Sequence, residues 1–343
     1  MVSTLDDTKR LSIATKLADM KALQNLLINN EQQLLQDCTD EDIRDRLQDM
    51  IEDDQKNMGV LDTVTVQYGV QGEPKETTQK MIEEVQKLME DSELTLFEKV
   101  SQQELLKHKQ TMAGLLIHKA AQVVGADIEA AITPLNTVNV ENRAHQEQLK
   151  GILEILGVRE LTGEEPAQGL WGRVQDAVAA VSGVVGSVVT RTDDEMSIRD
   201  LLLMDHTKAD TLFMEILGSN DPQKIQEYFG QLYKDIKVHG TAEEQVVYPV
   251  VRPYYEHTQE IYDQTDEVMQ MLEEIKPLAP SSSEFKAKVE QLRTAVRTHI
   301  NQEEKDIFPK LRDNFSDEQQ KQMATEFKTV KSQLQEEMAA SLA

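Results

Sequence analysis

The chain has 343 residues, with 62 acidic against 36 basic side chains and a formal net charge of -26. That length allows two domains whose cores exclude water. The negative field repels phosphate backbones and anionic membrane surfaces, so we expect no nucleic-acid partner and do not expect a membrane. The N-terminus MVSTLDDTKR lacks the basic start and apolar run of a secretory signal, so we expect a cytoplasmic protein.

The only cysteine is Cys38, so no intramolecular disulfide can form, and a metal site must use nitrogen and oxygen ligands. Straight-chain helix formers dominate, and apolar residues recur at three- and four-residue spacing. This pattern predicts an all-α protein. In the N-terminal part, helices are expected at 8–36, 40–68, 74–90, 94–124 and 135–156, the last ending at Gly157.

Polar residues lie on the apolar stripes of these first helices. They comprise one carboxylate on each of two helices and a Glu/His pair, four residues apart, on two others: Glu31, Asp54, Glu104/His108 and Glu141/His145. This resembles a ferritin-like layout, and the segment is interpreted as a ferritin-like bundle. The ferritin pattern is Glu-x-x-His, however, with one residue fewer. The alternative, that these polar residues pair with one another, is therefore favoured over a second metal site.

A segment rich in Val, Ala, Gly and Ser follows, with its uncharged part at residues 177–190. It is shorter than the ~20 residues that span a bilayer. Ala179, Gly183 and Ser187 lie four apart and would let another helix approach closely. We expect a buried or self-associating connector helix, with docking on a membrane surface as the alternative. The expected domains are therefore 1–160, a linker at 161–196, and 197–343.

The last part of the chain predicts helices at 198–217, 222–251, 255–275, 284–314 and 317–338. Two of them, KVHGTAEEQVVYP and RTHINQEEKDIFP, share one frame: His, three residues, Glu-Glu, three residues, an aromatic and Pro. A His and a Glu four residues apart project from one helix face. That spacing suits two ligands of one metal, or one terminal and one bridging ligand between two metals. The Pro ten residues after each His marks where the helix loosens.

The ligand candidates face the apolar seam, because His239 and Glu243 share a stripe with Ile236 and Val247. His299 and Glu303 lie on the corresponding stripe of the other helix, and His206 adds a third seam histidine. A carboxylate on such a seam costs several kcal/mol without a partner. Two such pairs and a further histidine favour a metal site. The alternative is that these are buried histidines that only form hydrogen bonds with the carboxylates.

The segment LLLMDHTKADTLF, the two frames and the helix spacing over 197–314 resemble the hemerythrin-like HHE cation-binding family. The resemblance implies a hemerythrin-like four-helix bundle with a non-haem, usually di-iron, centre. Its implied ligands are His206, His239, Glu243, His299 and Glu303. Iron rather than manganese rests on this resemblance alone. The expected fold is thus two tandem four-helix bundles, ferritin-like and then hemerythrin-like, joined by a Val/Ala/Gly-rich helical segment.

The third helix departs from the family, whose pattern there is Tyr/Phe-Glu-Glu-His. The stretch IYDQTDEV places Thr265 where the histidine belongs, and the nearest histidine is His257, eight residues or ~12 Å away along the helix. A hairpin that turns near Pro253 favours Thr265 beside the site, whereas the loop at 276–283 would tolerate the register with His257. Both remain open. With Thr265, one iron keeps an open coordination position.

These patterns lead to a functional hypothesis. The protein would bind iron and handle O2, peroxide or iron levels, in oxidative stress or iron homeostasis, with slow peroxide consumption as a candidate activity. O2 or peroxide would be its small ligand, and a homo-oligomer is compatible with the bundles. The alternative is a structural, self-assembling or membrane-docking helical protein that keeps a vestigial metal site.

Overall fold

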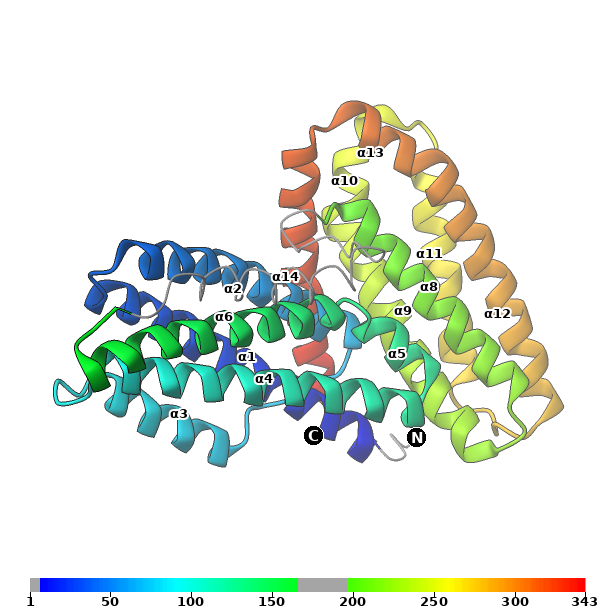
Figure 1. The fold of residues 1–343 in the computed structure, drawn as a ribbon. Helices are drawn as coiled ribbons and strands as arrows, with labels where there is room; N and C mark the ends of the chain where they lie inside the picture. Colours follow the sequence, from blue (N-terminus) through cyan, green and yellow to red (C-terminus); the bar gives the residue numbers. More distant parts are fainter. Residues whose placement is uncertain (1–6, 166–195, 343) are drawn as a thin grey trace.

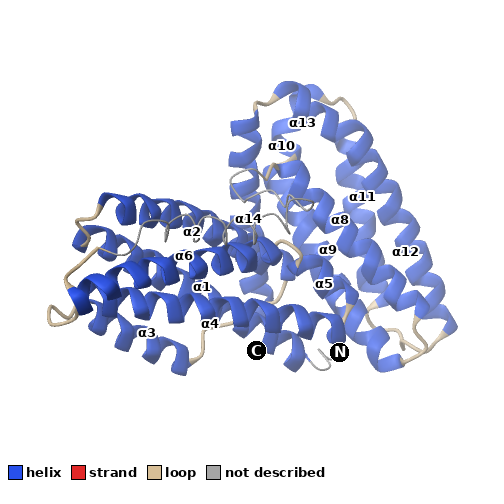
Figure 2. Ribbon diagram, viewed as in Figure 1, coloured by secondary structure: helices blue, strands red, loops and turns tan. Residues whose placement is uncertain are grey.

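The computed structural model describes residues 7–165 and 196–342. Within those residues the chain forms helices and loops and no strand, as Figure 2 shows. This confirms the all-α prediction. No helix in the described ranges is long and apolar enough to cross a membrane. The expected connector helix, with its uncharged part at residues 177–190, lies outside the described residues, so its conformation and the domain limits around it stay predictions.

Four long helices, α1, α2, α4 and α6, lie side by side in the N-terminal bundle (Figure 1). A shorter helix, α3, packs on α1 and α4, and α5 contacts both α4 and the C-terminal bundle. The helix bounds are α1 Asp7–Asp37, α2 Glu41–Tyr68, α3 Glu76–Met89, α4 Leu96–Val124, α5 Ala126–Ile132 and α6 Leu135–Thr162. Helix α5 was missed because the Gly and Pro around it were interpreted as a loop.

Local sequence explains where these helices start and end. The carboxylate of Asp40 accepts a hydrogen bond from the backbone N–H of Ile43 and caps α2. The prediction that Gly157 ends α6 was wrong, because α6 continues to Thr162 and ends at Gly163, whose φ is +72°. Gly157 lies inside the helix, where a Cβ would be 3.2 Å from the Phe97 ring, so it permits close packing.

The C-terminal bundle is built from α8, α9, α11 and α12, and α14 packs along α8 and α9. Short helices close the turn after α9 and extend α12. The bounds are α8 Ile198–Gly218, α9 Pro222–Val246, α10 Tyr248–Val251, η2 Arg252–Tyr254, α11 Thr258–Ile275, α12 Ser283–Gln302, η3 Glu303–Ile307, α13 Phe308–Asn314 and α14 Asp317–Leu342.

Both frame helices are interrupted where continuous helices were expected. Helix α9 ends at Val246, and the second frame passes through a five-residue π-helix, Glu303–Ile307. The cause is the proline of each frame, Pro249 or Pro309, which lacks an N–H and crowds the carbonyl four residues earlier. The loosening expected near the prolines is therefore confirmed, and π-helical turns of this kind often accompany functional sites.

The two bundles meet along α14, which contacts α2 as well as α8 and α9 (Figure 1). Arg10 is buried and pairs with Asp127 on α5 at 2.8 Å and with Glu227 on α9 at 3.3 Å. Lys208 on α8 donates hydrogen bonds of 2.7 and 3.1 Å to the last carbonyl oxygens of α2, those of Gln67 and Tyr68. Since Lys208 lies two residues after His206, the first bundle is tied to the helix that carries a candidate ligand.

Candidate metal centre

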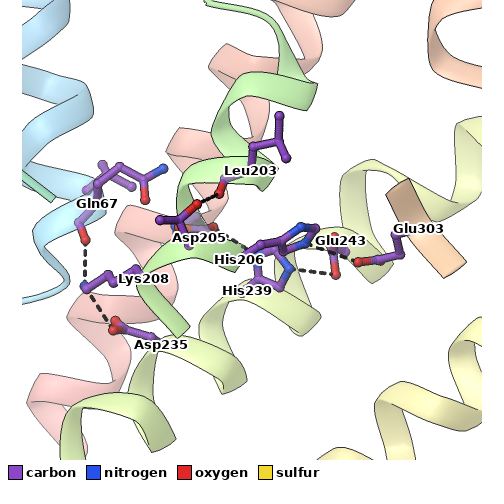
Figure 3. A network of polar contacts seen from close by, with 12 residues as sticks. Gln67, Leu203, Asp205, His206, Lys208, Asp235, His239, Glu243 and Glu303 are labelled. Carbon is purple, nitrogen blue, oxygen red and sulfur yellow. Dashed lines mark hydrogen bonds and ion pairs between the residues drawn. The ribbon is translucent and has the colours of Figure 1, made fainter. Parts of the chain in front are cut away.

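The five candidate ligands meet in the middle of the C-terminal bundle. His206 comes from α8, His239 and Glu243 from α9, His299 from the end of α12, and Glu303 from the start of the π-helix. Figure 3 shows four of them pointing toward one another. One donor atom from each of His206, His239, Glu243 and Glu303 lies within 4.8 Å of the others. The geometry thus brings the predicted residues together, and their role as ligands stays a prediction.

The spacing of the inner donor atoms suits a metal ion. His239 Nε2 lies 3.1 Å from Glu243 Oε2, and His299 Nε2 lies 3.4 Å from Glu303 Oε1. His206 Nε2 lies 3.3 Å from Glu303 Oε2. Neighbouring donors around an octahedral ion with bonds of about 2.1 Å are about 3.0 Å apart. The observed separations are therefore close to the edges of such a coordination shell.

Three buried atoms at the centre also make no hydrogen bond of good geometry: Glu243 Oε1, and the pair His206 Nε2 and Glu303 Oε2, which face each other at 3.3 Å. A buried polar atom without a partner costs free energy, and a buried carboxylate oxygen costs more than a neutral one. A cation between these atoms would satisfy all three. The donor set and its unsatisfied atoms therefore fit a metal ion.

Each histidine is held from behind through its outer nitrogen, Nδ1, as metal-binding histidines usually are. The partners come from three different positions along the chain, and none was identified from the sequence. They are Glu304 Oε1 for His206 at 2.9 Å, Asp205 Oδ2 for His239 at 2.9 Å, and Gln264 Oε1 for His299 at 3.3 Å. These contacts aim the Nε2 atoms inward. The only sequence signal was the second glutamate of the frame, which supplies Glu304.

Helix α14 contributes to the centre through Lys331. Its ammonium lies 2.7 and 2.6 Å from the two carboxylate oxygens of Asp205. Burial alone would raise the pKa of Asp205, but Lys331 and His239 outweigh it and hold that pKa below its ordinary value. Asp205 therefore stays ionised and keeps its hold on His239. A helix outside the four-helix bundle thus positions a candidate ligand.

The centre attracts positive charge. Burial would lower the pKa of His239, yet Glu243 and Asp205 together raise it well above its ordinary value. The pKa of Glu243 shows the reverse: burial would raise it, and His239 and His299 hold it well below its ordinary value. With no metal bound, protons on the imidazoles partly balance the negative charge of the carboxylates. A metal ion would replace those protons, so binding should weaken as pH falls.

Tyr248 is a site residue that the sequence analysis missed. It is fully buried, and its hydroxyl lies 2.7 Å from Glu303 Oε1, 3.0 Å from Glu243 Oε2 and 3.3 Å from His299 Nε2. Phe308 is the equivalent aromatic of the second frame, and its ring stacks on that of His206 with centroids 6.2 Å apart. The two frames therefore differ in what their aromatic residue offers to the centre.

The register of α11 places Thr265, and not His257, beside the centre. Thr265 is buried, donates a hydrogen bond of 3.1 Å to the carbonyl oxygen of Ile261, and lines a cavity of about 40 Å³ next to the histidines. His257 is 62% exposed at the start of α11 and pairs with Glu260. Helix α11 thus brings a hydroxyl and a small cavity to the place where the family has an imidazole. A cavity of this size has room for one water-sized molecule.

The polar seam of the N-terminal bundle is organised around Lys107, which the sequence analysis overlooked. Its ammonium is fully buried, lies 3.1 Å from Glu31 and 3.0 Å from His145 Nδ1, and pairs directly with Asp54. The seam residues therefore pair with one another, with a lysine as the central cation. Burial, with the charge of Asp54, raises the pKa of Glu31 to about 7.

The other predicted pair of that seam, Glu104 and His108, lies toward the surface of α4. The amide of Gln146 joins the two, at 2.7 Å from the Glu104 carboxylate and 3.3 Å from His108 Nδ1. This pair does not reach the buried cluster around Lys107. The seam residues therefore pair with neighbouring polar side chains, which is the alternative that the sequence favoured over a second metal site.

Comparison with known proteins identifies a domain in the C-terminal bundle and adds a whole-chain relative. The sequence profile of the hemerythrin HHE cation binding domain matches residues 197–311. A protein of Nostoc sp. named DNA nickase is 58% identical over 342 residues, which are 98% of this chain and 97% of that protein. An uncharacterized hemerythrin-like protein of Schizosaccharomyces pombe is 27% identical over 139 residues, 39% of this chain and 68% of that protein. No solved structure matches.

The chain therefore belongs to the family of the Nostoc protein, and its C-terminal part carries a hemerythrin HHE domain. Hemerythrin domains bind non-haem metal, so the prediction of a hemerythrin-like bundle is confirmed and a metal-binding role for it is supported. The expectation that the protein has no nucleic-acid partner is untested by the structure.

Glu141, beside the Lys107 cluster on α6, provides a pH-dependent prediction. Burial, then the charge of Asp53, raises its pKa to about 7. Between pH ~4.5 and ~7 the folded chain keeps a proton on this group that the unfolded chain has lost, so the group reduces stability as pH rises. Glu141→Gln should therefore raise the free energy of unfolding at pH 8, by up to about 3 kcal/mol, and by less at pH 5. Urea unfolding at the two pH values measures this.

Glu147→Gln is the matched control, because Glu147 is a partly exposed residue of the same helix, with 38% of its side chain accessible, and pairs with Lys150. It should change stability by less than about 0.5 kcal/mol at either pH. An equal effect of Glu141→Gln at pH 5 and pH 8 would contradict the raised pKa.

Proposed function

We propose that this chain binds two iron ions through His206, His239, Glu243, His299 and Glu303, and that Glu303 bridges them. The observation that carries the proposal is the position of the Glu303 carboxylate. Its Oε2 faces His206 at 3.3 Å, and its Oε1 faces His299 at 3.4 Å. A carboxylate whose two oxygens face histidines from different helices is placed to be shared between two ions.

The residues divide into two unequal sets. His206 and His239 would hold one ion together with Glu243, whereas His299 is the single imidazole on the other side of Glu303. The charge is suitable for iron, because Glu243 and Glu303 are both buried while Lys331 neutralises Asp205. Imidazole and carboxylate together are common ligands of iron. The choice of iron over manganese rests on the family.

Iron would supply the Fe²⁺/Fe³⁺ change and an open coordination position. The protein supplies the orientation of the imidazoles, the exclusion of water and the cavity beside Thr265, through which a small ligand could approach the poorer side. A site with so few histidines on one side favours reaction with O2 or peroxide over reversible O2 carriage. We propose this role in the cytoplasm, in defence against oxidants or in iron homeostasis.

Iron content tests the proposal. Protein purified without added metal should hold close to two irons per chain. His239→Ala combined with His299→Ala removes one imidazole from each side, so this variant should lose most of the iron. The control is His257→Ala, which changes an exposed histidine at the start of α11 and should leave the iron content unchanged. Full iron in the double variant would place the metal elsewhere, and no iron in the parent protein would refute the proposal.

DNA strand cleavage is a second candidate function, favoured by the Nostoc DNA nickase, whose similarity extends over both bundles at 58% identity. We propose that this chain shares that activity. The net charge of -26 gives no long-range attraction to phosphate, so contact with DNA would depend on local groups or bridging cations. A reactive metal centre offers a source of the chemistry, by oxidation of the sugar or by metal-activated water.

Nicking of a supercoiled plasmid tests this second candidate. If the metal centre is responsible, the iron-loaded protein should convert supercoiled to open-circular DNA, and the double variant His239→Ala/His299→Ala should lose at least tenfold in rate. His257→Ala should nick at the parent rate. Nicking by a double variant that holds no iron would separate the activity from the centre. Absence of nicking by the fully loaded parent protein would refute the candidate.

The same assay distinguishes the two chemistries. Nicks that DNA ligase reseals and that form without oxygen indicate hydrolysis. Nicks that need O2 or peroxide and cannot be resealed indicate oxidation of the sugar. The second result would unite the two candidate functions in one centre.

A further inference from the structure

We propose that Tyr248 is an oxygen ligand of the iron on the His299 side of the centre. The inference rests on the proposed iron site and goes beyond the five predicted ligands. The Tyr248 hydroxyl is the one phenol among the described residues that contacts three of the inner donor atoms. Those contacts are to Glu303 Oε1 at 2.7 Å, Glu243 Oε2 at 3.0 Å and His299 Nε2 at 3.3 Å.

Three donor atoms on the His299 side are spaced like one triangular face of an octahedral coordination shell. The Tyr248 hydroxyl, Glu303 Oε1 and His299 Nε2 make a triangle with sides of 2.7, 3.3 and 3.4 Å. The edge of an octahedron with bonds of about 2.1 Å is about 3.0 Å. An ion that binds His299 and Glu303 would therefore also lie within bonding reach of the phenol oxygen.

The His299 side needs such a donor. Helix α11 brings Thr265 to the place of an imidazole, and the Thr265 hydroxyl already donates to the carbonyl oxygen of Ile261 at 3.1 Å. Without Tyr248, the ion would have one imidazole and shared carboxylate oxygens. A phenolate adds negative charge and a strong oxygen donor, which favours Fe³⁺ over Fe²⁺.

The backbone explains why the hydroxyl points inward. Helix α9 ends at Val246, the break at Val247 follows, and Tyr248 opens α10 just before Pro249. The ring is fully buried and packs edge-on against Tyr262, with centroids 5.1 Å apart. The same position in the second frame is Phe308, which has no hydroxyl and stacks on His206. The repeated frame thus supplies a phenol to one side of the centre alone.

Coordination has a clear chemical consequence. The phenol oxygen gives up its proton to solvent and forms a bond to Fe³⁺ in its place, with no change in oxidation state. A phenol that only donates hydrogen bonds to Glu243 and Glu303 keeps its proton and has no visible absorption. A phenolate on Fe³⁺ produces a charge-transfer band in the visible and tyrosinate vibrations in the resonance Raman spectrum. The two roles are therefore distinguishable.

The experiment uses the full-length, iron-loaded, oxidised protein, with iron content measured on the same samples. The parent protein should show the band and the vibrations, and both should disappear in Tyr248→Phe, which keeps the ring and loses one oxygen. Tyr262→Phe is the matched control, because it removes the hydroxyl of the packing neighbour and should keep the band. Ring-deuterated tyrosine should shift the vibrations of the parent protein, a test that needs no variant.

Three results would overturn the inference: an iron-loaded parent protein without the band, a band that survives in Tyr248→Phe, or vibrations that ring-deuterated tyrosine leaves unshifted. Each would leave the proposed iron site standing. A parent protein that holds no iron would instead refute the proposed function and this inference with it. The iron assay therefore separates failure of the ligand from failure of the site.

Discussion

Two carboxylates buried inside an apolar helix bundle are the constraint on which this structure depends. Glu243 and Glu303 are almost inaccessible to water, and negative charge in such a place needs positive charge beside it. Three imidazoles turn their Nε2 atoms toward them. Behind the imidazoles, Glu304, Asp205 and Gln264 hold the outer nitrogens, and Lys331 of α14 holds Asp205. The surrounding residues therefore hold positive charge, either protonated imidazoles or a metal ion, next to these two carboxylates.

The N-terminal bundle meets the same constraint differently. Glu31 and Asp54 are equally buried, but Lys107 places a covalently attached ammonium between them. That cation cannot exchange, whereas protons on imidazoles can be replaced by metal ions. This difference between a fixed ammonium and exchangeable protons favours a metal in the C-terminal bundle and not in the N-terminal one. Helix α14 and Lys208 connect the two bundles close to the centre, so the first bundle supports the helices that carry the ligands.

Features set by local spacing could be predicted from the sequence, and features set by tertiary packing could not. The His/Glu frames follow helical periodicity, so the sequence alone could predict that four side chains face the seam: His239, Glu243, His299 and Glu303. Tyr248 was not, because its direction depends on a break that Pro249 causes. Lys107 could not be recognised as a buried cation, because its partners Glu31 and Asp54 come from other helices, and the contact of Lys331 with Asp205 joins residues 126 positions apart. The expectation of no nucleic-acid partner was based on the net charge of the whole chain, which says little about local contact with DNA.

The most direct test of the central claim is anomalous X-ray diffraction at the iron absorption edge from crystals of the iron-loaded protein. The account predicts two iron peaks, one on each side of the Glu303 carboxylate. One should lie beside His206 and His239, and the other beside His299 and the Tyr248 hydroxyl. A single peak would contradict the bridging role of Glu303. Iron beside Lys107, or no iron between these residues, would contradict the assignment of the centre itself.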